Sequence, residues 1–194
     1  MIAGHFGFAA LVKQRERSTP LWALMLACQW LDVVFVPLLV GGIETLNPIA
    51  GSKPGAYGES IIYADYTHSL VGALVLSALF GGVALLAWGR RSALVLGAVV
   101  FSHWVLDLLC HRGDMPILPG NAGHLPRLGF GLWRIPAASL AAELVLVVAG
   151  GWLYWRAAVD VSRAAGRPVG RANLAGAVVL GSCIITLVLN GLGM

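Results

Sequence analysis

Charged residues are scarce in this sequence: they make up 11% of its 194 residues, whereas 58% are hydrophobic and the mean hydropathy is +0.82. Soluble domains carry about 25% charged residues, so this composition excludes an ordinary soluble domain and indicates an integral membrane protein. Basic residues exceed acidic ones only by 13 to 9. In a membrane protein such an excess marks cytoplasmic loops, so membrane lipids are the expected partners and no nucleic acid is expected.

Cysteine is also scarce, and Cys28, Cys110 and Cys183 all fall in apolar segments. This pattern excludes a disulfide framework and a CxxC site, and it is typical of small buried side chains. The first residues lack a charged region ahead of an apolar run, so we expect no cleaved signal peptide. Glycine, by contrast, is abundant at 25 residues, which favours close helix packing in lipid.

Long apolar runs dominate the chain, and five of them reach the roughly 20 residues that a helix needs to cross a bilayer. They cover residues 21–43, 61–88, 92–111, 137–155 and 173–192. Residues 1–12 are apolar but too short to cross, and predict a short helix. Internal repeats are lacking. We therefore predict a single integral membrane domain, residues 1–194: an all-α, polytopic transmembrane helical bundle with five spanning helices plus a short N-terminal helix.

The basic residues divide unequally between the two sides of this topology. Four fall on one side: Lys53, Arg112, Arg127 and Arg134. Nine fall on the other: Lys13, Arg15, Arg17, Arg90, Arg91, Arg156, Arg163, Arg167 and Arg171. The positive-inside rule makes the side with nine cytoplasmic and puts both termini outside, with a bacterial inner membrane as the expected location.

One apolar segment, residues 101–111, carries three polar side chains at regular spacing. His103, Asp107 and His111 lie four residues apart, which stacks them along one face of a helix. Imidazole and carboxylate groups are metal ligands. Ionisable groups inside a membrane segment are costly and often functional, so this face predicts a site.

Other ionisable residues fall in the same outer half of the predicted bundle. Imidazoles and carboxylates suit zinc, with manganese or iron as alternatives, so the set predicts one or two divalent metals. A carboxylate near the site, Glu143 or Asp65, would accept a proton from water in hydrolysis. Arg112, Arg127 or Arg134 would hold an anionic group. The predicted metal ligands are His5, Asp32, His68, His103, Asp107 and His111.

Simpler interpretations stay open at these positions. His103 and Asp107 can form a buried hydrogen bond that joins helices, and a histidine at a helix end, such as His111, can be solvated. Two further functions compete with a hydrolase. One is a non-catalytic small subunit or assembly factor bound to other membrane protein subunits. The other is a permease that relays protons through Asp32, Asp65 and Asp107.

Short motifs in the first 107 residues resemble those of the YdjM-like family of membrane-bound metal-dependent hydrolases. Residues 103–107 resemble its H-x-x-x-D signature, and residues 67–70 resemble its T-H-S-L element. His5 fits the early histidine of the family, and Asp32 lies where the family has P-D-x-D. The family is similar in its ligands to zinc-dependent phospholipase C, so the resemblance implies phosphoester hydrolysis.

The sequence departs from the family at four positions. Leu31 replaces the proline and Val34 the second acid of P-D-x-D, while Tyr63 and Ala64 replace the usual His-Arg before T-H-S-L. These losses remove polar positions from the implied site. The resemblance therefore implies a hydrolase or a degenerate relative of one.

Overall fold

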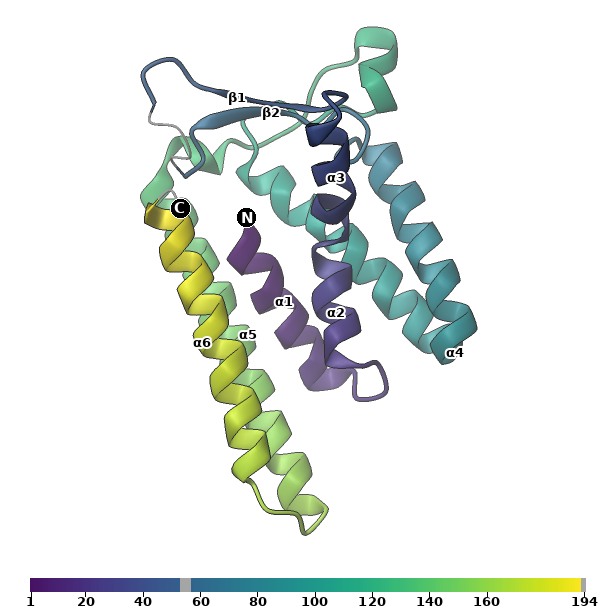
Figure 1. Ribbon diagram of the computed structural model, residues 1–194, viewed down its shortest axis with the longest axis vertical. Coiled ribbons are helices and arrows are strands. Elements are labelled where there is room, and N and C mark those ends of the chain that lie inside the picture. The colour runs from purple at the N-terminus through teal and green to yellow at the C-terminus, as the bar shows by residue number, and fades with distance from the viewer. Residues whose placement is uncertain (53–56, 193–194) are drawn as a thin grey trace.

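The computed structural model describes residues 1–52 and 57–192, so Lys53 of the charge pattern lies outside the described residues. Within these ranges the chain is mainly helical (Figure 1). The α-helices are α1 (Ile2–Arg15), α2 (Leu21–Cys28), α3 (Trp30–Val40), α4 (Leu70–Cys110), α5 (Pro136–Ala164) and α6 (Gly170–Leu192). The remaining elements are the strands β1 (Thr45–Pro48) and β2 (Ser60–Tyr63) and the 3-10 helices η1 (Pro119–His124) and η2 (Leu132–Arg134).

Three of these helices, α4, α5 and α6, are long and apolar enough to cross a membrane. Helices α2 and α3 together pass the same test, but they are bent by 48° and join at Gln29. The expectation of a helical protein with membrane-crossing helices is confirmed at this level. The predicted segment 21–43 is therefore a broken pair of helices, not one straight span.

Helix α4 covers two of the predicted spans and reverses direction at Gly89 (Figure 1). Gly89 has φ 77° and ψ 178°, a conformation that side chains rarely adopt. The two halves then pack closely: a Cβ on Gly81 would lie 3.1 Å from the Ala93 carbonyl oxygen. A Cβ on Gly97 would likewise lie 3.2 Å from the Ser77 carbonyl oxygen. Small residues thus allow α4 to fold back on itself as a helical hairpin.

Helix α1 lies among the longer helices and packs most closely on α5 (Figure 1). A Cβ on Gly7 would lie 2.6 Å from the Leu146 carbonyl, and a Cβ on Gly150 would overlap the carbonyl of Gly7. Glycine is required at both positions because the two backbones touch. This contact fixes α1 in the centre of the molecule, with His5 buried in it.

Strands β1 and β2 form an antiparallel hairpin that pairs Thr45 with Tyr63 and Pro48 with Ser60. The prediction of a helix over 61–88 is therefore wrong for its first residues, which belong to β2 and the turn after it. Backbone pairing with β1 therefore holds these residues in an extended conformation instead of a helix. Helix α4 begins after Ser69, whose side chain accepts a hydrogen bond from the Gly72 amide at 3.0 Å.

The basic connections lie at the end of the bundle opposite the hairpin (Figure 1). They are the α1–α2 link, the reversal in α4 and the α5–α6 link. The last is shorter than predicted, because α5 continues to Ala164 and α6 begins at Gly170.

Candidate metal centre

The carboxylate of Asp107 is the meeting point of four histidines. The Nε2 atoms of His5 and His103 lie 3.1 Å from its Oδ1 and Oδ2, respectively. The Nε2 atoms of His68 and His111 both lie 3.7 Å from Oδ2. All five side chains are buried. The backbone nitrogen of Met1 approaches the same group, 3.3 Å from Oδ1.

Asp32 adds a second carboxylate to this cluster. Its Oδ1 lies 3.5 Å from His68 Nε2 and 3.6 Å from His103 Nε2, and these two nitrogens are 3.3 Å apart. The Asp32 side chain is 34% exposed, whereas that of Asp107 is 4% exposed. The cluster therefore has one buried and one accessible carboxylate.

The six predicted ligands come from four separate segments of the fold. His5 lies on α1 and Asp32 in the first turn of α3, while His68 precedes α4. The Trp104 indole donates to the His68 carbonyl at 2.9 Å and fixes the backbone there. The remaining three ligands lie on the second half of α4 or at its end: His103, Asp107 and His111.

Three of the histidines have their other ring nitrogen held by an acceptor. Such contacts place the proton on Nδ1 and direct the Nε2 lone pair into the cluster, as in metal centres where a second layer of residues orients the ligands. The contacts are His103 with the Cys28 carbonyl (2.7 Å), His68 with Thr67 Oγ1 (2.9 Å) and His111 with Asp114 Oδ1 (2.8 Å).

The Thr67 hydroxyl accepts a hydrogen bond from His68 Nδ1 because it donates its own proton to Glu44. Thr67 Oγ1 donates to Glu44 Oε2 at 2.9 Å. Glu44 is fully buried and also accepts from the backbone amides of Tyr66 and Thr67, at 2.7 and 2.8 Å. These contacts, from Glu44 through Thr67, fix the orientation of the His68 ring.

His5 is held differently from the other three. Its ring stacks on that of His103, with centroids 3.8 Å apart and planes 12° apart. Its Nδ1 is buried and contacts no protein acceptor among the described residues. Stacking, not a hydrogen bond on the far side, therefore orients this ring.

The spacing of these atoms fits a metal ion. Ligand atoms at 2.0–2.1 Å from a tetrahedral zinc lie about 3.3 Å from one another. The separations quoted above run from 3.1 to 3.7 Å. Two groups of side chains could hold an ion. One is His5, His103 and Asp107, all buried; the other is Asp32, His68 and His103, of which Asp32 is partly exposed.

Outside the helices, Asp114 supports the cluster as a charged acceptor. Burial acts to raise the pKa of Asp114, but its hydrogen bond with His111 acts in the opposite direction, and the pKa lies below its ordinary value. Asp114 thus remains a carboxylate that can hold the His111 Nδ1 proton. His111 is 2% exposed, so the interpretation of a solvated histidine at the helix end is wrong.

A cavity of about 410 Å³ opens beside the cluster. Its polar side carries Asp32, His68, Asp107 and His111. Its other walls are largely apolar and include Phe35, Val36, Leu46, Ile62 and Trp133. The volume falls within the range of small-molecule sites, about 300–1,000 Å³. A molecule with a polar group and an apolar body would match this lining.

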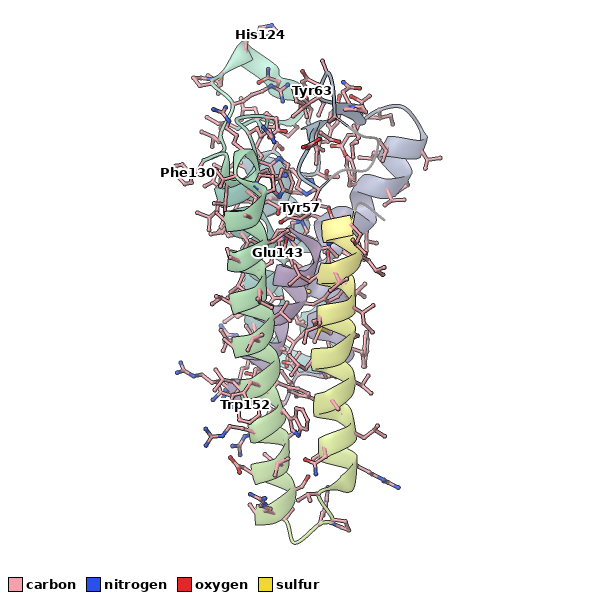
Figure 2. The ribbon with its side chains drawn as sticks, turned by 90° about the vertical axis from the view of Figure 1, so that its left-hand side faces the viewer. Tyr57, Tyr63, His124, Phe130, Glu143 and Trp152 are labelled. Carbon is pink, nitrogen blue, oxygen red and sulfur yellow. The ribbon has the colours of Figure 1, made fainter. Side chains whose placement is uncertain are left out.

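The two predicted proton acceptors have other contacts. Glu143 is fully buried and accepts hydrogen bonds from the Gly4 amide at 2.9 Å and from the Tyr57 hydroxyl (Figure 2). Asp65 binds Arg127 through both oxygens, at 2.6 and 2.9 Å. Neither carboxylate lines the cavity. Their role as proton acceptors stays a prediction, whereas their contacts join segments of the fold.

Several groups of the site are not among the residues predicted from the sequence. Thr67 is adjacent to His68 and Asp114 follows His111 by three residues, so both stood close to predicted ligands. Glu44 lies in a loop far along the chain from His68, and the Cys28 carbonyl belongs to the backbone. No sequence signal identifies such partners, because only the folded chain brings them to the histidines.

Comparisons of the chain with protein-family models, with curated proteins and with solved structures found no match. The function is therefore inferred from the geometry of the site.

Proposed function

We propose that this protein is an integral membrane metal-dependent hydrolase, with zinc as the ion. One observation carries the proposal: four Nε2 atoms face the Asp107 carboxylate, and three of those rings are fixed through Nδ1. Buried hydrogen bonds between helices would need one such pair, not four rings around one carboxylate. Oriented imidazoles around a carboxylate are typical of metal sites.

A bound ion of this kind would lower the pKa of a water molecule, so that it can attack a carbonyl or phosphoryl centre near neutral pH. Asp32 is the best placed residue to take the proton from that water. It lines the cavity and is the more exposed of the two carboxylates. Asp107, almost fully buried, serves as a ligand.

The substrate that fits best is an ester with an apolar body, either a phosphoester or a lipid-like molecule. Its polar group would lie against Asp32 and His68, and its apolar part against Phe35 and Val36 of α3. Val36 is 54% exposed, and on a membrane-crossing segment it would face lipid. This wall supports entry of the substrate from the outer half of the bilayer.

The finer topology belongs to the same proposal. Both halves of α4, the α2–α3 pair, α5 and α6 make five full crossings. Helix α1 runs from the outer half of the bundle to the first basic connection, so the basic connections are cytoplasmic and both termini lie outside. The location would be a bacterial inner membrane, and the short motifs around His5, His68 and His103 would make the chain a divergent YdjM-like protein. The charge bias of the connections supports this orientation.

The metal content of detergent-purified protein tests the proposal. We expect about one zinc per chain in the wild type, and its loss in His103→Ala, because a ligand is removed. His124→Ala is the matched control, since His124 is exposed on the loop at the far tip of the molecule (Figure 2). A wild-type protein without stoichiometric metal would contradict the proposal.

An assay with a chromogenic phosphodiester then distinguishes the proposed metal ligand, Asp107, from the proposed proton acceptor, Asp32. Asp32→Asn should retain metal and lose activity, whereas Asp107→Asn should lose both. A non-catalytic subunit of a membrane complex is the second candidate, favoured by the engagement of Glu143 and Asp65 in other contacts. Metal retention without hydrolysis of any ester, together with copurification of a defined complex, would support it.

A further inference from the structure

A second pocket, of about 460 Å³, lies on the opposite side of strand β2 from the metal cavity. Side chains of a strand alternate between its two faces. Ser60 and Ile62 line the metal cavity, whereas Ile61 and Tyr63 line the second pocket. Strand β2 is therefore the wall between the two spaces.

Arginine dominates the second pocket, which we call the arginine pocket. Arg112, Arg127 and Arg134 line it together with Asp114. Arg112 is held by the carbonyls of Gly58 and Trp133, at 2.9 and 2.8 Å. The loop 111–134 thus brings three guanidinium groups to one space.

The carboxylates near these arginines are already engaged. Asp114 accepts from His111 Nδ1 through Oδ1 and from the Ile62 amide through Oδ2, at 2.8 and 2.9 Å. Asp65 is bound by both terminal nitrogens of Arg127. Three guanidinium charges therefore face two carboxylates, which leaves the pocket positive.

Several arginine nitrogens also remain available. Among the described residues, Arg112 Nη1, Arg127 Nε and the Nε and Nη1 of Arg134 donate to no protein acceptor. Planar guanidinium groups suit oxyanions with several acceptor oxygens, and phosphate offers more of them than a carboxylate. The pocket thus combines excess positive charge, available donors and enough volume.

We propose that the arginine pocket binds a phosphate group, carried either by a lipid headgroup or by free phosphate. This site is distinct from the metal centre and does not need an ion. It shares Asp114 with that centre, so a bound phosphate lies one side chain away from His111.

Calorimetric titration of metal-depleted, detergent-purified protein tests this site. One arm uses inorganic phosphate, and the other uses a short-chain phosphatidic acid, with the matching diacylglycerol as a neutral control. We expect saturable binding of one of these phosphate probes, and the arm that binds identifies the source. Phosphate depletion during purification precedes both titrations.

The deciding variant is Arg134→Gln, because Arg134 is exposed and its one hydrogen bond within residues 1–52 and 57–192 is long, 3.3 Å to the Arg112 carbonyl. Loss of one charge-assisted hydrogen bond should weaken binding about 10-fold. Arg163→Gln, on an exposed site of α5 at the other end of the bundle, is the matched control and should bind as the wild type does. The proposal is overturned if neither probe binds, or if both variants weaken binding equally.

Because binding is measured without metal, a failed hydrolase proposal would leave this result unaffected. Likewise, a protein that holds zinc but no phosphate would overturn only the arginine pocket.

Discussion

Two buried carboxylates near opposite ends of helix α1 have different kinds of partners. Glu16, 4% exposed, accepts from the Ser18 amide at 3.0 Å, from the Ser18 hydroxyl and from Arg91 Nε at 2.8 Å. Asp107, 3% exposed, is surrounded instead by imidazoles and the Met1 nitrogen.

These two sets of partners distinguish a carboxylate that stabilises the fold from a carboxylate that binds a metal. A buried carboxylate that receives backbone, hydroxyl and guanidinium donors is satisfied by the protein alone. Imidazoles whose Nδ1 protons are already donated elsewhere offer lone pairs, not protons, to the carboxylate they face. The Met1 nitrogen is one cationic partner of Asp107, and a metal ion among the imidazoles, or protonation of the rings, would stabilise its carboxylate further.

Asp107→Asn should have the largest effect. It removes the group on which all four imidazoles converge, so zinc affinity should fall by more than about 100-fold, since outer partners alone can account for that much. Metal content and a competition titration with a chelating dye measure it. Asp160→Asn, an exposed acid on α5, is the control. Unchanged metal binding in Asp107→Asn would show that Asp107, like Glu16, is not a metal ligand.

Asp114→Asn should have the next largest effect. The ligand His111 stays, but its Nδ1 loses a charged acceptor at 2.8 Å, so zinc affinity should fall about 10- to 100-fold. The same dye competition measures the change. Asp65→Asn serves as control, because Asp65 contacts Arg127 and no predicted ligand. Equal losses in both variants would argue against an orienting role for Asp114.

Thr67→Val should have a smaller effect of the same kind. The side chains are similar in size, but valine cannot accept from His68 Nδ1 or donate to Glu44. We expect about a 10-fold loss of zinc affinity and a lower thermal unfolding midpoint. Ser182→Ala provides the comparison, because the Ser182 hydroxyl donates to the Val179 carbonyl within α6, away from the cluster. A destabilised variant with unchanged zinc affinity would assign Thr67 to the fold alone.

Glu16→Gln should have the smallest effect. It should lower the free energy of unfolding by about 1 kcal/mol, because its partner Arg91 is 75% exposed and the ion pair is screened by solvent. Zinc content should not change, since Glu16 lies away from the cluster. Measurement of the thermal unfolding midpoint in detergent, with metal analysis on the same sample, tests both statements. Metal loss in this variant would contradict the assignment of Glu16 to the fold and of Asp107 to the metal centre.

Stability against pH should also report on Glu16. Burial acts to raise its pKa, but hydrogen bonds from Ser18 and Arg91 lower it from 4.5 to about 2. A lowered pKa stabilises the folded state above pH 4.5, and this contribution is lost as the pH falls towards 2. The difference in unfolding midpoint between wild type and Glu16→Gln should therefore shrink over that range. A constant difference would contradict the assignment.

The membrane-crossing character of the chain and the alignment of its best candidate ligands could be predicted from the sequence. Both depend on local properties. Apolar runs longer than about 18 residues report on a lipid environment wherever they occur. The spacing of His103, Asp107 and His111 places them on one helical face before any neighbour is known.

The partners of those residues depended on the tertiary structure. His5 lies beside His103 because the close contact between Gly7 and Gly150 packs α1 against α5. The two pockets are separate because residues 60–63 form strand β2 instead of the predicted helix. The same holds for Asp65, which binds Arg127 from 62 residues away. Hydrogen bonds and ion pairs act over a few ångströms whatever the separation along the chain, so only the packed bundle decides which acid faces an arginine and which faces four histidines.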